Sequence, residues 1–198
     1  MKYVEYVKEH FNDPGFPVVR LSDLRIALKT KGISDAYLKR LVNYLMHRGE
    51  LKRITKGTYT LHEEITVVGF AFQPFYYGLE NALTIRKLWE QSTNPIIITP
   101  KKARTGVRKF GDNNYVVQRI DKKLFFGYEL IKHYDFWIPV SDPEKTLLDF
   151  VYFKHYLRED VLRELKRTIS KKKLAMYLKR YTPEFRGKFF KTLSIKLP

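Results

Sequence analysis

The fold of this chain is decided by residues 34–61, SDAYLKRLVNYLMHRGELKRITKGTYTL. The first half of this stretch predicts a helix that ends at a glycine. Ser34 can accept a hydrogen bond from a free backbone N–H of the first turn, and Gly49 can adopt the left-handed conformation that ends a helix. The apolar residues recur at helical spacing, so one side of the helix should be buried. These residues are Leu38, Leu41, Val42 and Leu45.

The opposite face of this helix is polar, with Arg40, Asn43 and His47 among its residues. After Gly49, residues 51–54 and 58–61 are β-prone runs around a Thr-Lys-Gly turn, which predicts a hairpin with a lysine at its tip. A helix with one buried and one polar face, followed by such a hairpin, is typical of a winged helix-turn-helix. The alternative is a solvated amphipathic helix beside an ordinary hairpin.

The residues before this stretch extend the pattern. Residues 1–11 predict a first helix, Val18 and Val19 a short strand, and Ser22 caps a second helix at residues 23–31. In a winged helix the third helix enters the major groove, and the hairpin lies against phosphates or the minor groove. We therefore expect a DNA-binding domain at residues 1–63. The predicted DNA contacts are Ser34, Ala36, Tyr37, Lys39, Arg40, Asn43, Tyr44, His47, Arg53 and Lys56.

The composition favours a polyanionic partner. The chain has 198 residues, with 38 Lys and Arg against 21 Asp and Glu, a net charge of +17. Nucleic acid is the commonest polyanion, and no apolar run approaches the roughly 18 residues that a membrane span needs. Cysteine is absent, which excludes disulfides and thiolate metal sites. With no signal peptide evident at the start, we expect a cytoplasmic protein that does not bind membranes.

A second domain is expected at residues 64–198. Residues 64–140 predict a small mixed sheet with one helix: strands at residues 65–72, 96–99, 115–120, 124–126 and 134–140, and a helix at residues 77–89. Asp142 and Pro143 then start a helix that reaches about residue 156. Further helices are expected at residues 160–169, 171–181 and 183–193. The predicted fold class is α+β: a winged helix-turn-helix, a small mixed α/β domain and a helical C-terminal tail.

Two segments of the second domain are strongly basic. Residues 101–123 carry 8 Lys and Arg against 2 acids, and residues 157–198 carry 13 against 4. Such surfaces can bind nucleic acid or an acidic protein. The candidate basic surface consists of Lys101, Lys102, Arg104, Arg108, Lys171, Lys172 and Lys173.

Three short stretches resemble the AbiEi-type antitoxins, a family of transcriptional regulators of phage-defence systems. They are LKRITKGTY at residues 51–59, YYGLENAL at residues 76–83, and FFG at residues 125–127 leading to VSDPEKTLLD at residues 140–149. The last run is the most specific. The resemblance implies an antitoxin of a type IV toxin–antitoxin system that autoregulates its operon. It also implies a nucleotidyltransferase-like toxin as the functional partner, counteracted without a stable complex.

The Asp-Pro-Glu-Lys run could also suggest a metal-dependent nuclease, which needs acidic groups and a lysine around a cation. Helical spacing places Glu144 and Lys145 about 100° apart, and Asp142 is needed as a cap. We therefore expect a structural role for Asp142, Pro143, Glu144, Lys145 and Asp149.

No other pattern in the chain predicts an enzyme. The five histidines lack metal-ligand spacing, so we expect no metal, no cofactor and no catalytic residues. An RNA-binding module remains an alternative, because the chain has 14 Tyr and 14 Phe on which bases could stack.

The expected partner is double-stranded DNA with repeated half-sites. One winged helix reads few base pairs, so useful specificity needs two copies. The two half-sites would be filled by a homodimer or by two monomers side by side.

Overall fold

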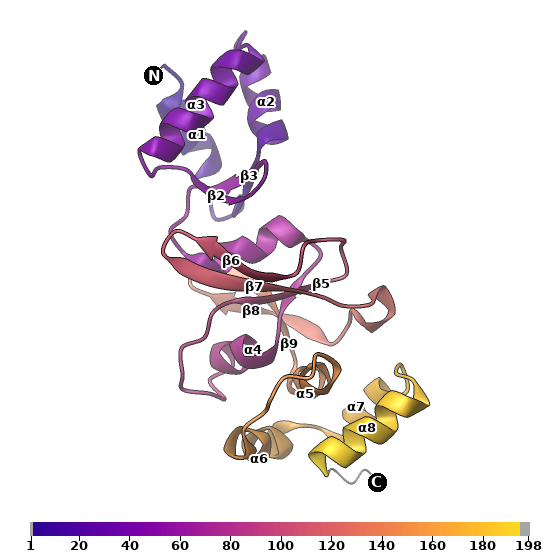
Figure 1. Cartoon of the computed structure of the whole chain (residues 1–198). Helices are drawn as coiled ribbons and strands as arrows, with labels where there is room; N and C mark the ends of the chain where they lie inside the picture. Colours follow the sequence, from indigo (N-terminus) through magenta and orange to yellow (C-terminus); the bar gives the residue numbers. More distant parts are fainter. Residues whose placement is uncertain (1, 195–198) are drawn as a thin grey trace.

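The computed structural model describes residues 2–194. Figure 1 shows three tiers: the N-terminal helices at one end, a twisted sheet in the middle and the C-terminal helices at the other end. Three clusters of buried apolar side chains correspond to these tiers and their junctions. No helix in the described range is both long and apolar enough to cross a bilayer.

The N-terminal tier has the predicted order of elements. It contains α1 (Val4–Phe11), β1 (Val19–Arg20), α2 (Leu21–Lys29), α3 (Asp35–His47), β2 (Lys52–Thr55) and β3 (Thr58–Thr60). The three strands form an antiparallel sheet in the order β1-β3-β2. The helices close over a core that includes Val7, Leu24, Leu28, Leu41 and Leu45.

The boundaries of α3 follow from the residues predicted to set them. The Ser34 hydroxyl accepts a hydrogen bond from the backbone N–H of Tyr37 at 3.3 Å, and Gly49 has a φ of 71°. The start of α2 was predicted wrongly. The helix begins at Leu21 rather than after Ser22, because the Asp23 carboxylate accepts from the backbone N–H of Arg20 at 3.0 Å.

The middle tier is a six-stranded mixed sheet in the order β6-β7-β5-β4-β9-β8. Its strands are β4 (Tyr76–Tyr77), β5 (Ile96–Thr99), β6 (Gly106–Phe110), β7 (Asn113–Arg119), β8 (Tyr128–His133) and β9 (Phe136–Ser141). The β5–β7 and β4–β9 pairs are parallel, and the other pairs are antiparallel. The fold class is therefore α+β, as predicted.

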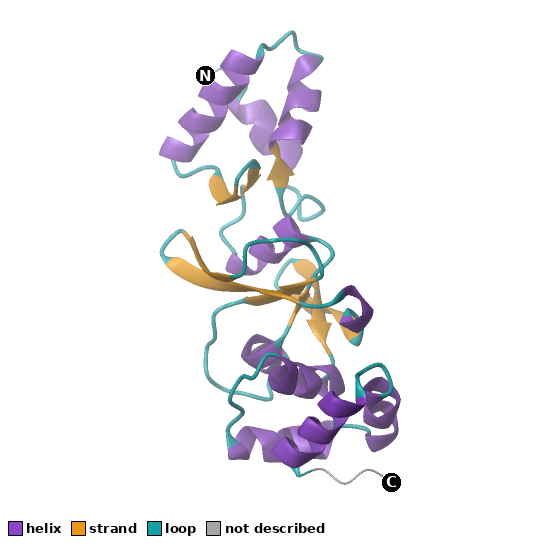
Figure 2. Cartoon of the chain, turned by 45° about the vertical axis from the view of Figure 1, so that its right-hand side comes forward, coloured by secondary structure: helices purple, strands orange, loops and turns teal. Residues whose placement is uncertain are grey.

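Both faces of the central strands are buried, and alternate residues enter different cores. Tyr76 and Ile98 lie in the cluster shared with the C-terminal helices, whereas Tyr77 and Ile97 lie in the cluster nearer the N-terminal tier. The sheet thus separates α4 (Leu79–Ile85) and the C-terminal helices from the N-terminal elements (Figure 2).

The predicted strand at residues 65–72 is instead a 3₁₀ helix, η1 (Ile65–Phe72). Its apolar run covers the sheet rather than joining it. The Tyr77 hydroxyl bonds to the Thr66 carbonyl and accepts from the Gly69 N–H at 3.0 Å. Two backbone groups of this segment are therefore satisfied by a side chain.

Three further boundaries differ from the prediction. Residues 124–126 form no strand: Leu124 ends the short 3₁₀ helix η2 (Lys122–Leu124), and residues 125 and 126 follow it. The helix expected at residues 77–89 is confined to α4, because Tyr76 and Tyr77 belong to β4. Strand β8 was not predicted, since its sequence YELIKH lies at the sheet edge and exposes most of its side chains.

The C-terminal tier contains α5 (Pro143–Tyr152), α6 (Glu159–Thr168), α7 (Lys171–Leu178) and α8 (Pro183–Leu193). All four were predicted, although α5 ends four residues early. Helix α5 lies against the sheet, and α6, α7 and α8 pack around its other side (Figure 1).

The N-terminal tier is joined to the sheet through its hairpin. Ile54, on β2, is 5% exposed and lies in the core of the middle tier. Its backbone carbonyl accepts a hydrogen bond from the Tyr115 hydroxyl at 2.9 Å. The core of the middle tier therefore includes a side chain from residues 1–63, the predicted DNA-binding domain.

Candidate functional site

The exposed face of α3 is the first part of the candidate site. Lys39, Arg40, Asn43 and His47 are exposed, and Ala36 lies with them. Lys39, Arg40 and His47 form no ion pair within the described residues. The buried stripe of α3 packs into the N-terminal core, so the helix has one face available for a ligand.

Three predicted DNA contacts have local structural roles. Ser34 caps α3, and the half-buried Tyr37 ring meets Tyr3 edge to face at 6.1 Å. Tyr44 accepts a hydrogen bond from Arg48 at 3.0 Å. Ser34, Tyr37 and Tyr44 therefore stabilise α3 and its surroundings. The exposed side chains of Lys39, Arg40, Asn43 and His47 are the free donors and acceptors on this face.

The hairpin is the second part of the candidate site. Arg53 and Lys56 are exposed and have no ion-pair partner within residues 2–194. The turn is held against α2, because the backbone N–H of Leu21 donates to the Gly57 carbonyl at 2.9 Å. The hairpin therefore presents its basic side chains from a fixed position.

The tip of the hairpin lies beside the basic loop before β6. Thr55 lines one groove together with Lys101, Lys102, Arg104 and Arg108. The structure thus brings together two segments that the sequence singled out separately. Of the four cations, Arg108 is the most constrained: its guanidinium lies 5.1 Å from the Phe72 ring centroid and donates to the Arg104 carbonyl.

The Asp-Pro-Glu-Lys run builds a buried polar network at the start of α5. Asp142 accepts from the backbone N–H of Lys145 at 2.7 Å, as expected for a cap. Lys145 forms an ion pair with Asp149, and neither side chain has any exposed surface. The Tyr76 hydroxyl donates to Asp149 at 2.8 Å, and the Tyr181 hydroxyl lies 3.3 Å from the Lys145 ammonium.

Burial dominates the electrostatics of this network. It lowers the pKa of Lys145 and raises the pKa of Asp149, so each charge depends on the other to remain ionised. Burial also raises the pKa of Tyr76, which keeps its hydroxyl a donor to the carboxylate. The pair itself was not predicted, although the spacing of Lys145 and Asp149, one helical turn, could have indicated it.

Two of the three stretches that carry the family resemblance meet at this network, whereas the stretch at residues 51–59 forms the hairpin of the N-terminal tier. Gly127, from the FFG stretch, has a φ of 73°, and a Cβ there would lie 2.9 Å from the Lys145 Cβ. Its carbonyl accepts from the backbone N–H of Asp142 at 2.9 Å. Tyr76 comes from the YYGLENAL stretch. The sequence did not indicate the contributions of Tyr76, Tyr177 and Tyr181, because they lie far from α5 along the chain.

Helix α7 is attached to the same network. The Lys173 ammonium lies 3.0 Å from Asp142 and 3.2 Å from Glu144. The Tyr177 hydroxyl donates to Asp142 at 2.8 Å, and the Glu144 carboxylate accepts from the Ser170 N–H at 2.6 Å. Lys173 is therefore wrongly placed in the candidate basic surface. Lys171 and Lys172 are exposed and have no ion-pair partner in the described part of the chain.

The acidic and basic side chains of this network are closed off from solvent. Asp142, Glu144, Lys145 and Asp149 are all buried and bonded to protein groups. Among residues 2–194, no three His, Cys, Asp or Glu side chains gather into a group that could hold a metal ion.

The chain is thus an α+β protein with two exposed basic regions, one at α3 and the hairpin and one at the start of α7, and one buried ionic network. Its fold is similar to the crystal structure of the RV2827C protein from Mycobacterium tuberculosis. The match covers 89% of this chain and 71% of that chain, with a TM-score of 0.60 and 16% sequence identity. At this identity the likeness shows the fold alone. No family model and no curated protein matches the chain.

Proposed function

We propose that this chain is a cytoplasmic, sequence-specific DNA-binding transcriptional regulator and not an enzyme. The observation that carries the proposal is the exposed face of α3, where Arg40 and Asn43 are free of partners in the described structure. Arginine pairs with guanine O6 and N7, and asparagine with adenine N6 and N7, in the major groove. In this proposal the N-terminal tier acts as a winged helix, with α3 as its reading helix.

The hairpin and the adjoining loop would contact the DNA backbone. Lys56, Lys101 and Lys102 are exposed cations around one groove or beside it. Contacts of this kind fix the register of a protein on duplex DNA without reading its sequence. We expect an operator with two half-sites, filled by a dimer or by adjacent monomers, because one such unit reads few base pairs.

The biological role that we propose rests on the resemblance to AbiEi-type antitoxins. The chain would repress its own operon and counteract a nucleotidyltransferase-like toxin. What supports this beyond the sequence is that two of the three stretches that carry the resemblance, residues 76–83 and the FFG and VSDPEKTLLD run, converge on one network around Lys145 and Asp149.

Duplex binding can be tested by fluorescence anisotropy with the DNA upstream of the gene and with a random duplex of equal length. Arg40→Ala should lose about 1–3 kcal/mol on the upstream DNA and less on the random duplex. Lys56→Ala should weaken both alike and reduce the slope of log K against log salt by about 0.9.

Lys191→Ala is the matched control, because Lys191 is an exposed cation on α8, in the C-terminal tier at the opposite end of the molecule from α3 (Figure 1). Equal losses on both duplexes for Arg40→Ala would contradict the proposed role of α3. Preference for single-stranded RNA over duplex DNA would favour the RNA-binding alternative instead.

A further inference from the structure

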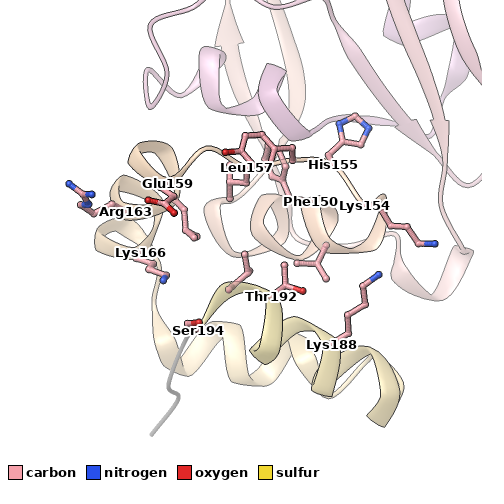
Figure 3. A pocket seen from close by; sticks show the side chains of 14 residues that line it. Phe150, Lys154, His155, Leu157, Glu159, Arg163, Lys166, Lys188, Thr192 and Ser194 are labelled. Atoms are coloured by element: carbon pink, nitrogen blue, oxygen red, sulfur yellow. The ribbon is translucent and has the colours of Figure 1, made fainter.

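A groove in the C-terminal tier is separate from both the DNA-binding surface and the buried network. It has a volume of about 770 Å³ and lies between the end of α5, helix α6 and helix α8 (Figure 3). Its floor is apolar, with Phe150, Val151, Leu157, Leu162 and Leu193 among its lining residues. The volume is in the range of ordinary ligand sites.

The rim of this groove is strongly basic. Lys154 and Lys188 extend toward one end, and Lys166 lies at the other end, where the Arg163 side chain points outward from α6 (Figure 3). None of these four cations forms an ion pair within the described residues. Glu159 is the acidic residue among the groove's described lining residues.

Two of the three acids of α6 pair away from the groove, so Glu159 alone faces the four cations among the described lining residues. Asp160 pairs with Arg158 at 2.6 Å, and Glu164 pairs with Arg167 at 3.1 Å. Asp160 and Glu164 are therefore paired with neighbouring arginines, while Arg163 and Lys166 have no ion-pair partner in the described residues. An apolar floor with free cations at both ends calls for a ligand with an apolar body and an anionic group toward each end.

The backbone at Lys154 adds independent support. Lys154 follows α5 with a φ of 57°, in the left-handed region that favours glycine. The N–H groups of Lys154 and His155 donate back to Val151 and Phe150, the pattern that usually ends a helix at a glycine. A lysine here costs stability that glycine would not, and its ammonium reaches the groove.

We propose that this groove binds an acidic, apolar peptide segment of another protein, with leucine-like side chains on the floor and carboxylates at the two cationic ends. A nucleic acid duplex carries its charge on a convex outer surface and has no apolar group to fill the hollow. A peptide supplies both features within a few residues. This inference is independent of the proposed DNA binding.

The test is selection of a phage-displayed random dodecapeptide library on the full-length chain, followed by anisotropy with the enriched peptides. The enriched sequences should place Asp or Glu on both sides of an apolar pair. Lys188→Ala and Lys166→Ala should each weaken binding about tenfold, as loss of one charge-assisted contact predicts. Lys191→Ala, an exposed cation on α8 outside the groove lining, is the matched control.

Lys154→Gly separates binding from folding. It should raise the midpoint of thermal unfolding, because glycine accepts the left-handed backbone, and should still weaken peptide binding about tenfold. Its operator affinity should be unchanged. Enrichment of neutral or basic peptides, equal binding by the groove variants, or displacement of the peptide by a dodecathymidine strand at equal concentration would overturn the proposal.

Discussion

A lysine ammonium with no exposed surface keeps its charge only if a partner replaces its hydration shell. For Lys145 that partner is the Asp149 carboxylate, itself fully buried and held by the Tyr76 hydroxyl. Removing one member of such a pair leaves the other charge buried without compensation. The stability of the C-terminal tier should therefore depend on the pair rather than on either residue alone.

We expect Lys145→Met to lower the free energy of unfolding by about 3–5 kcal/mol in urea titrations. The double variant Lys145→Met with Asp149→Asn should lose less than the sum of the two single changes, with a coupling of about 1–3 kcal/mol. Asparagine removes the stranded charge and can still accept from Tyr76. Lys172→Met, at an exposed position, is the control and should change stability by less than about 0.5 kcal/mol. Simple additivity would contradict the described pairing.

His155 provides a pH-dependent contribution. Its hydrogen bond with Glu80, at 3.3 Å, raises the pKa of His155 above its ordinary value. A raised folded-state pKa gives a stabilisation that is complete below the unfolded pKa of about 6.5 and is lost as pH rises through the folded value. The stability difference between wild type and His155→Gln should be larger near pH ~5.5 than near pH ~8.5, by about 0.5–1 kcal/mol.

Thermal unfolding at the two pH values measures this difference. His47→Gln is the control, because His47 is exposed and has no acidic partner in the described chain. A larger stability difference at the higher pH would contradict this prediction and show that the folded protein holds His155 in its neutral form.

Some residue-level features were readable from the sequence and others were not. Caps such as Ser34 and Asp142 act on backbone groups a few residues away, so their local sequence is sufficient. The partners of Asp149 and Lys173 come from segments 73 and 31 positions away, through Tyr76 and Asp142. No local pattern carries that information.

At the scale of elements, α7 is attached to α5 by polar contacts as well as by its buried Leu174 and Leu178. Tyr177, in its second turn, donates a hydrogen bond to Asp142 at the start of α5. Lys173, in its first turn, forms ion pairs with Asp142 and Glu144. Burial raises the pKa of Tyr177 to about 12, so its hydroxyl remains a donor across the physiological range. The three neighbouring lysines at the start of α7 should consequently behave differently.

Lys173→Glu should destabilise the chain by about 2–4 kcal/mol, because it places a third carboxylate beside Asp142 and Glu144. The pair Lys171→Glu and Lys172→Glu should leave the unfolding midpoint nearly unchanged, since both side chains are exposed. Circular dichroism melts of the two variants provide the comparison. Equal destabilisation by both would show that helix charge, and not the described contacts, governs α7.

The elements that the sequence missed have physical reasons. The apolar run at residues 65–72 has no alternation, and an apolar run buried on all sides does not distinguish a strand from a covering helix. Strand β8 is an edge strand whose pairing to β9 supplies its structure, and Leu130 is 63% exposed. Its pattern therefore lacks the inward apolar residues from which strands are predicted.

At the scale of the whole molecule, the three tiers share side chains. We expect the isolated fragment 1–63 to be less stable than the same residues in the full chain, because Ile54 loses its cover and the Tyr115 hydrogen bond. Burial of one such side chain contributes about 1.5–3 kcal/mol, a large share for so short a domain.

Ile54→Thr isolates this effect. In the full chain it should cost about 2–3 kcal/mol, whereas in the fragment, where the position is solvated, it should be nearly neutral. Hydrogen exchange and thermal melts of both lengths measure the difference. An equal cost in both would mean that Ile54 belongs to the N-terminal core and that the tiers fold separately.

The burial of Ile54 in the middle tier also prevents the N-terminal tier from rotating freely relative to the sheet. Because the hairpin is anchored in the large sheet, the N-terminal tier and the sheet keep one relative orientation. In the proposed complex, α3 in the major groove would therefore fix the direction in which the rest of the protein projects from the DNA axis. This direction around the DNA axis repeats with the helical turn of about 10.5 base pairs. Half-sites spaced by a whole number of turns would place two copies on the same side of the DNA, within reach of each other. An extra half turn would place them on opposite sides, and any cooperation between them would disappear.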